Sequence, residues 1–312
     1  MFLFNGQISN WREWGGIFQS IAAFGPLVEH ILAIEKLPAA KLENLSPGTN
    51  AVFKAGDYVV KVFAPCESGI DQTPDLQTEL FAAARADELG ISAPAMVAHG
   101  LIEDKYKFAY IITEYIAGAE FKDAVKVMGV ADRLAIGCKL RAVTDKMNKP
   151  CGPFNSIDVI NDADDARRFR RWDERYNESF RAERLAYIRS HNYGEKVFVH
   201  GDLCGDNILL APDGELYIID FADAVLAPIE YEHALIAVAL FELDAALIEG
   251  YFGNCSADEL ASVCFNGLLI HDFGGDIVAQ LIGDPGEVLS LCDLQNKLKA
   301  MITKHRFVNK VT

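Results

Sequence analysis

The sequence predicts an α+β fold in two parts, a β-rich first third followed by a largely helical remainder. Short runs rich in β-branched and aromatic residues gather before residue 114, and turn residues separate them. After residue 114 apolar residues mostly recur at helical spacing. The exception is residues 197–221, where two apolar strands flank a turn. We therefore expect residues 1–113 to form one lobe and residues 114–312 to form a second.

The first predicted elements are helices followed by a hairpin. Pro26 stands where a first-turn proline would stand, ahead of apolar residues at helical spacing. Residues 51–54 and 58–63 are both β-rich, and the turn between them contains Gly56. This order predicts a helix packed before the first strands of the β-rich part.

The next predicted element is a helix that begins at Thr73 and Pro74, a capping residue and a first-turn proline. Gly90 is expected to end it, because glycine adopts the backbone conformation that follows a helix. Residues 108–113 predict a further strand. Near the end of the chain, Ser256 opens a capping box and hence another helix.

Composition limits the classes of function. The chain has 312 residues, 51% of them hydrophobic, which is enough for substantial cores. A net charge of −16 argues against nucleic acid or an anionic membrane as a partner and is compatible with a cationic small molecule. Seven scattered cysteines, without a Cys-x-x-Cys pair, indicate reduced thiols. With no leader-like start and no long apolar run, we expect a cytoplasmic protein.

One stretch carries the chemistry. His200, Asp202 and Asn207 follow the pattern His-x-Asp-x4-Asn on a loop that runs into a strand. The turn Asp213-Gly214 then leads to a second strand that ends at Asp220. Asp202 is expected to steer or accept the proton of an attacking hydroxyl. Asn207 and Asp220 offer hard oxygen ligands suited to Mg2+ on a nucleoside triphosphate. We expect His200 to hold the loop rather than to react.

This pattern resembles the aminoglycoside phosphotransferase and choline-kinase-like group of small-molecule kinases. Gly201 after the loop histidine, and Phe221-Ala222 after the metal aspartate, favour this group over protein kinases. The resemblance implies a two-lobed protein-kinase-like fold with a nucleotide-binding first lobe and a catalytic, acceptor-binding second lobe. It also implies Mg2+ and ATP or GTP as the phosphoryl donor.

Two further residues are assigned through this resemblance. Lys61 shares an apolar strand face with its neighbours, an expensive place for an ammonium group without a partner. A lysine at this position of the family holds the α- and β-phosphates, and Glu79 in the following helix is expected to support it. Lys54 and Glu88 are the competing choices.

The remaining nucleotide contacts are predicted by position. Ser46, Gly48 and Thr49 occupy the phosphate-covering loop if residues 41–45 form a first strand, although a plain turn is an equal reading. Glu114 and Ile116 follow the last strand of the first lobe, where family members bind the adenine edge through the backbone. An ordinary linker would look the same.

The acceptor is a small molecule whose identity the sequence leaves open: an aminoglycoside-like antibiotic, an amino alcohol or a sugar. Acidic candidates for its pocket, or for surface solubility, are Glu230, Glu232, Asp244 and Asp272. Asp272 also begins an Asp-Phe-Gly sequence, which we interpret as an interhelix loop and not as the metal motif. An atypical protein kinase and a catalytically silent nucleotide-binding module are the alternative functions.

Overall fold

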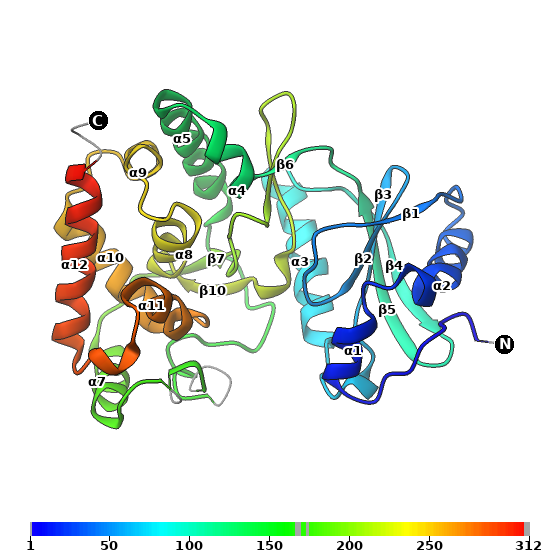
Figure 1. Cartoon of the computed structure of the whole chain (residues 1–312), viewed down its shortest axis with the longest axis horizontal. Coiled ribbons are helices and arrows are strands. Elements are labelled where there is room, and N and C mark those ends of the chain that lie inside the picture. Colours follow the sequence, from blue (N-terminus) through cyan, green and yellow to red (C-terminus); the bar gives the residue numbers. More distant parts are fainter. Residues whose placement is uncertain (1, 166–169, 173–174, 309–312) are drawn as a thin grey trace. The chain divides into compact units, whose positions relative to one another are not determined.

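The computed structural model describes residues 2–165, 170–172 and 175–308. The chain forms two compact units, the first of Met1–Asp87 and Ser92–Ala117 and the second of Glu88–Ile91 and Gly118–Thr312 (Figure 1). The predicted boundary before residue 114 falls at the end of a strand of the first unit, because Glu114 still pairs with Tyr58 there. The strand-rich and helix-rich halves of the α+β prediction correspond to these two units.

The first unit consists of an antiparallel sheet with helices before and within it. Its elements are α1 (Trp11–Ile17), α2 (Ile21–Ile34), β1 (Leu42–Asn44), β2 (Ala51–Ala55), β3 (Tyr58–Val62), the 3-10 turn η1 (Cys66–Ser68), α3 (Thr73–Leu89), β4 (Met96–Glu103) and β5 (Lys107–Glu114). The strands follow one another in the order β1-β2-β3-β5-β4. The predicted hairpin is confirmed, with Gly56 in the left-handed conformation at its turn. Helix α3 also begins and ends as predicted.

The prediction that Pro26 lies in the first turn of its helix is wrong. Helix α2 begins at Ile21, and the side chain of Ser20 caps it by accepting a hydrogen bond from the N–H of Ala23 at 3.2 Å. A proline inside a helix removes one backbone hydrogen bond. The helix persists because one of its faces, which includes Phe24, is completely buried in the core of this unit.

The core of the first unit lies between the N-terminal helices and the sheet. Phe24 packs against Phe53 of β2, with ring centroids 5.7 Å apart, and against Phe108 of β5 at 6.1 Å. Phe4 fills the same cluster from the segment before α1. The residues preceding the first strand are therefore part of the sheet's core.

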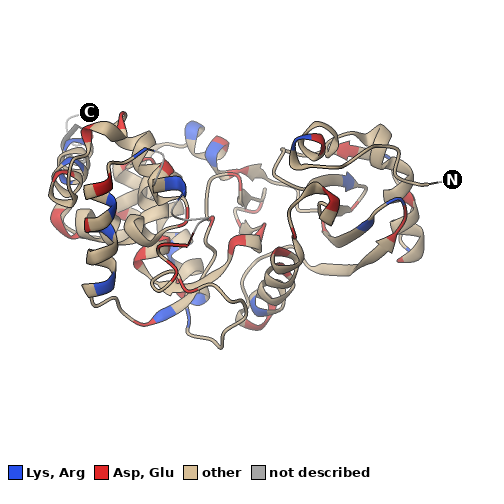
Figure 2. Cartoon of the chain, turned by 90° about the horizontal axis from the view of Figure 1, so that it is seen from below, with Lys and Arg blue, Asp and Glu red and all other residues tan. Residues whose placement is uncertain are grey.

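The second unit is mainly helical, with short strands. Its elements are β6 (Ala119–Glu120), α4 (Phe121–Ala124), η2 (Val125–Val127), α5 (Val130–Met147), α7 (Glu178–Ser190), β7 (Lys196–Val199), β8 (Ile208–Leu210), β9 (Leu216–Ile218), η3 (Phe221–Asp223), β10 (Val225–Pro228), α8 (Glu230–Leu235), the π-helical η4 (Ile236–Leu240), α9 (Ala245–Phe252), α10 (Ala257–Ile270), α11 (Gly274–Ile282), η5 (Pro285–Glu287) and α12 (Leu291–Val308). Figure 2 shows acidic residues distributed over both units.

Two strand pairs of the second unit determine where its polar loop lies. β8 pairs with β9 around the predicted turn, in which Gly214 has φ +83°. β7 pairs with β10, so that Val199 lies opposite Val225. The loop that leaves β7 and the segment that enters β10 are therefore brought side by side, and between them they carry all the charged groups of the predicted motif.

The predicted capping box at Ser256 is confirmed at the start of α10. Within the described residues, no single helix is long and apolar enough to cross a membrane, although α1 and α2, bent by 84°, meet the criteria of length and composition as a pair.

Candidate active site

The loop between β7 and β8 is held by a buried histidine. The Nε2 of His200 lies 2.9 Å from the carbonyl oxygen of Ile219, and its Nδ1 accepts a hydrogen bond from the N–H of Asp202 at 3.2 Å. One ring thus joins the loop to the end of β9 and orients the backbone of Asp202. Because the side chain is completely buried, this geometry agrees with the structural role expected of His200.

Asn207 fixes the side chain of Asp202. Its Nδ2 donates to the carbonyl oxygen of Asp202 at 2.8 Å and to its carboxylate at 3.0 Å. This arrangement uses the nitrogen of the amide and leaves its Oδ1 as the atom suited to bind a cation. The sequence-predicted pair Asp202 and Asn207 is therefore brought together within one loop.

Asp220 lies two residues after the end of β9 and has a left-handed backbone, at φ +61°. A residue other than glycine rarely adopts this conformation, which is frequent at functional sites. Its side chain is exposed, as is that of Asp223.

Gly201 allows the loop and this segment to approach each other. A Cβ at Gly201 would lie 2.0 Å from the carbonyl oxygen of Asp223, and its φ of +83° also disfavours other residues. The glycine found after the loop histidine is therefore required by the geometry of this site.

The neighbouring carboxylates raise the affinity of Asp202 for a proton. Burial and then the negative charges of Asp223 and Asp220 raise the pKa of Asp202 to about 7. A cation bound beside these groups would favour their ionised forms and stabilise the cluster. This electrostatic pattern fits a site that works with a bound metal ion.

The residues present suit Mg2+, which needs few protein ligands, better than a metal ion that is coordinated by protein side chains alone. Across the described part of the chain there is no group of three or more His, Cys, Asp or Glu residues suited to a metal. Asn207 and Asp220 supply one amide oxygen and one carboxylate. Mg2+ typically takes one or two such ligands and completes its shell with water and substrate phosphates.

In the first unit, Lys61 and Glu79 form a buried ion pair. The Nζ of Lys61 lies 2.8 Å and 3.1 Å from the two carboxylate oxygens of Glu79, and each residue is 7% exposed. Lys61 lies on the central strand β3, and Glu79 lies in α3. The competing residues are arranged differently, since Lys54 lies over the ring of Tyr115 at 4.2 Å and Glu88 is exposed.

The predicted phosphate loop is exposed, whereas Glu114 of the predicted linker still belongs to the sheet of the first unit. Residues 42–44 form β1, so Ser46, Gly48 and Thr49 do lie in the β1–β2 loop, where all three are exposed. The N–H of Glu114 donates to Ala95 at 3.0 Å within the unit. This N–H is therefore already bonded inside the first unit.

Glu232 supports the loop between β7 and β8 (residues 200–207), which we call the catalytic loop, and the sequence did not indicate this role. Its carboxylate accepts hydrogen bonds from the N–H groups of His200 and Gly201, each at 3.2 Å, and from Asn148 at 3.4 Å. Glu232 is completely buried, so its suggested place in an acceptor pocket is wrong. Burial raises its pKa to about 7.

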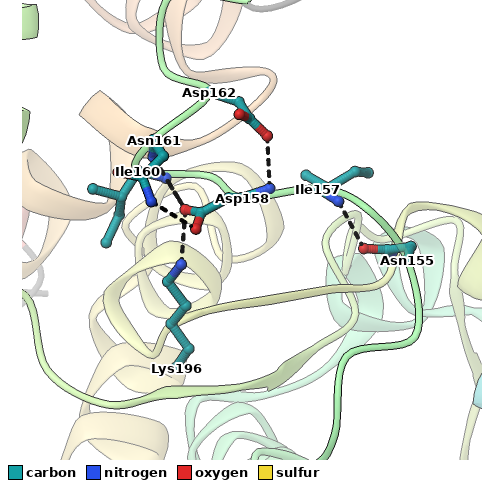
Figure 3. Close-up of polar contacts among 7 residues, drawn as sticks. All are labelled: Asn155, Ile157, Asp158, Ile160, Asn161, Asp162 and Lys196. Carbon is teal, nitrogen blue, oxygen red and sulfur yellow. Dashed lines mark hydrogen bonds and ion pairs between the residues drawn. The ribbon is translucent and has the colours of Figure 1, made fainter.

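A second support comes from the segment between α5 and α7. Asn155 donates to the carbonyl oxygen of Ala224 at 2.9 Å, directly after the segment that carries Asp220. Figure 3 shows how this segment is fixed. The carboxylate of Asp158 accepts from the N–H groups of Ile160 and Asn161 and pairs with Lys196 of β7 at 2.7 Å. Asn155 and Asp158 were not recognised in the sequence, because Ala224 and Lys196 lie far from them along the chain.

The other acidic candidates have varied surroundings. Asp244 caps α9 and lies 3.2 Å from Arg133, so it has a structural role. Asp272 lies between α10 and α11, as expected for an interhelix loop, and its N–H donates to the hydroxyl of Tyr231 at 3.2 Å. Glu230 is half-buried in the first turn of α8. Asp206 of the catalytic loop pairs with Lys122.

Solved structures with the same fold include several kinases of small molecules. The GDP and kanamycin complex of APH(2")-IIia aligns with a TM-score of 0.57 and 16% identity, covering 92% of this chain and 99% of that one. A thermostable mutant of aminoglycoside phosphotransferase APH(4)-Ia, in complex with ADP and hygromycin B, has a TM-score of 0.58 and 16% identity, covering 88% and 98%. A choline/ethanolamine kinase family protein from Mesorhizobium loti aligns with a TM-score of 0.51 and 18% identity, covering 85% of this chain and 88% of that one.

These likenesses confirm the kinase-like α+β fold. A comparison with curated protein sequences gives no match. The model of the phosphotransferase enzyme family matches residues 46–260, which is more than half of the chain and includes the Lys61–Glu79 pair and the whole catalytic loop. The chain therefore belongs to the phosphotransferase enzyme family.

Proposed function

We propose that this protein is a small-molecule kinase that transfers the γ-phosphoryl group of ATP or GTP to a hydroxyl group of a small acceptor. The observation that carries the proposal is the arrangement of Asp202, Asn207 and Asp220 at the end of one strand pair. A proton acceptor, an amide oxygen and a carboxylate in this arrangement match the needs of phosphoryl transfer to a hydroxyl.

Each residue has a defined role in this proposal. Lys61, held by Glu79, positions the phosphates of the nucleotide, and the exposed loop of Ser46, Gly48 and Thr49 covers them. Asn207 and Asp220 hold Mg2+, which supplies positive charge against the triphosphate. These roles are supported by the burial of the ion pair and by the accumulation of carboxylates around Asp202.

Asp202 orients the acceptor hydroxyl and takes its proton late in the transfer. Its carboxylate is held by Asn207, and its backbone is held by His200. Burial and the neighbouring carboxylates raise its pKa without a metal, and Mg2+ bound beside it would favour the ionised form, which is the form that accepts a proton.

The acceptor we propose is a hydroxylated, cationic molecule such as an aminoglycoside-like antibiotic or an amino alcohol, with sugars as neutral candidates. The net charge of −16 favours cations. The similar structures carry kanamycin with GDP in one case and hygromycin B with ADP in another, so both nucleotides and both antibiotics belong among the compounds to be tested.

The test is the release of ADP or GDP from Mg-ATP and Mg-GTP in the presence of aminoglycosides, other hydroxylated antibiotics, choline and sugars. Asp202→Asn is the variant that we expect to lose most of its activity. Asp206→Asn is its matched control, because Asp206 is an exposed carboxylate of the same loop and pairs with Lys122. We expect acceptor-dependent release by the wild type and by Asp206→Asn, and its loss in Asp202→Asn.

Four other results have distinct meanings. Release that survives Asp202→Asn would contradict the role of Asp202. Nucleotide binding without release for any acceptor, or phosphate incorporated only into added polypeptides, would favour a silent module or a protein kinase, respectively. Absence of nucleotide binding would exclude the kinase function.

A further inference from the structure

The N-terminal segment, residues 2–37, lies outside the part of the chain that matches the phosphotransferase family, which begins at residue 46. It is nevertheless built into the first unit. Phe4, Phe24 and Leu27 are almost completely buried against the sheet. The contacts of this segment with the rest of the unit indicate what it does.

One end of the segment is anchored to the turn between β4 and β5. The N–H groups of Leu3 and Phe4 donate to the two carboxylate oxygens of Asp104 at 2.8 Å and 2.7 Å. The N–H of Ile8 donates to the hydroxyl of Tyr106 at 2.9 Å. Hydrogen bonds to a charged carboxylate are among the stronger ones, so the segment enters α1 from a fixed position.

From this fixed position, α1 reaches the β1–β2 loop. Trp14 is 1% exposed, and its ring packs against Phe24 and Phe18. Its Nε1 donates a hydrogen bond to the backbone carbonyl of Thr49 at 2.8 Å. The backbone of Thr49 is thereby bonded to the buried side chain of Trp14, although the side chain of Thr49 is exposed.

We propose that Trp14 is a positioning residue for nucleotide binding, which holds the β1–β2 loop in the conformation that receives the phosphates. The inference rests on the proposed function, because it takes Ser46, Gly48 and Thr49 as the phosphate-covering residues. A loop that is ordered before binding loses less conformational entropy when the nucleotide arrives, so the hydrogen bond increases affinity without touching the nucleotide.

The test is the affinity of Trp14→Phe for Mg-ATP and Mg-GTP, measured by calorimetry, together with its steady-state kinetics. Phenylalanine keeps an aromatic ring in the core but has no N–H to donate. We expect the nucleotide Kd and the nucleotide KM to rise about fivefold, the equivalent of one hydrogen bond. The kcat and the KM for the acceptor should stay within twofold, because the second unit is unchanged.

Phe4→Leu is the matched control for a loss of core packing. Phe4 is 2% exposed in the same cluster but is bound to Asp104 and not to the loop. We expect it to lower the unfolding midpoint as Trp14→Phe does, with the nucleotide Kd unchanged. Equal changes in Kd for both variants, or no change in Trp14→Phe, would reduce Trp14 to a core residue and overturn the inference.

Site-specific replacement of Trp14 by 3-benzothienylalanine covers the case in which Trp14→Phe does not fold. This isostere has sulfur in place of the N–H, so it keeps the shape of the ring and removes only the donor. The same fivefold loss of nucleotide affinity, with faster deuterium exchange in residues 46–50, is expected. Unchanged affinity would overturn the inference, whereas absence of nucleotide binding by the wild type would overturn the proposed function and this inference with it.

Discussion

The charged groups that we assign to function are balanced in the first unit and unbalanced in the second. In the first unit, Lys61 and Glu79 neutralise each other inside the protein, each 7% exposed. In the second unit, Asp202 is surrounded by further carboxylates, and its pKa is raised to about 7 by burial and by Asp223 and Asp220. The ion pair of the first unit is thus neutral before any ligand arrives, whereas the carboxylates around Asp202 in the second unit carry an excess of negative charge.

This difference indicates which kind of ligand suits each group of charges. A buried ion pair holds an ammonium group in one place at the expense of desolvation, which is useful where a phosphate must be oriented. A cluster of carboxylates is destabilised by its own repulsion, and a divalent cation relieves that repulsion. The following variants remove one charge at a time, beginning with the largest expected effect.

Asp220→Asn removes the carboxylate that we assign to Mg2+. We expect turnover to fall about a thousandfold, since an amide contributes no charge to a divalent cation or to the transition state that it stabilises. Affinity for Mg-ATP should fall as well, whereas affinity for ATP measured in EDTA should not. Calorimetry with and without Mg2+ checks this, and an unchanged magnesium dependence would show that the metal is held elsewhere.

Asp202→Asn keeps an oxygen that Asn207 can bond but removes the proton acceptor. We expect turnover to fall about a hundredfold, because base catalysis contributes moderately to a loose phosphoryl-transfer transition state. The nucleotide Kd should be unchanged. Single-turnover kinetics measures the chemical step, and a variant with reduced affinity but normal chemistry would contradict the assignment.

Lys61→Met leaves the carboxylate of Glu79 buried beside an apolar chain. We expect a loss of roughly 3 kcal/mol in the free energy of unfolding, together with weaker nucleotide binding. The double variant Lys61→Met/Glu79→Leu should recover most of the stability but none of the nucleotide affinity. Urea denaturation and calorimetry separate the two effects, and a double variant less stable than the single one would mean that the pair is not coupled.

The sequence was informative where function depends on local spacing. The pattern of His200, Asp202 and Asn207, with Asp220 after one turn, lies within 21 residues. The strand pair around that turn follows from two short apolar runs separated by Asp213-Gly214. The α+β fold could be predicted for the same reason, since hairpins and capped helices are local. The position of Pro26 was misjudged because the packing of α2 outweighs one missing hydrogen bond.

The sequence was uninformative where a role depends on contacts between distant residues. Nothing in the sequence distinguishes Glu232 from the other acidic residues. In the structure it accepts hydrogen bonds from the N–H groups of His200 and Gly201, about 30 residues earlier. Asn155 and Trp14 likewise act through single backbone carbonyls, of Ala224 and Thr49, which leave no pattern in the sequence. Such supports become visible only when hydrogen-bond partners are known.

The smallest expected effect concerns Glu232, a buried carboxylate that stabilises a backbone and binds no ligand. In the folded protein burial raises the pKa of Glu232 to about 7, whereas in the unfolded chain the pKa is close to its ordinary value of 4.5. Between these values the folded state binds more protons, so the stability contributed by this group falls as pH rises and is constant above 7.

Glu232→Gln removes this titration but not that of Asp202, which therefore cancels when the two proteins are compared. The free energy of unfolding of the wild type, minus that of the variant, is expected to fall between pH 5 and pH 7 and to level off by pH 8. Urea denaturation at these pH values measures the difference. A difference that rises with pH would mean that the N–H groups of His200 and Gly201 stabilise the ionised carboxylate more than burial destabilises it, and the charged form of Glu232 would then be the one that holds the catalytic loop.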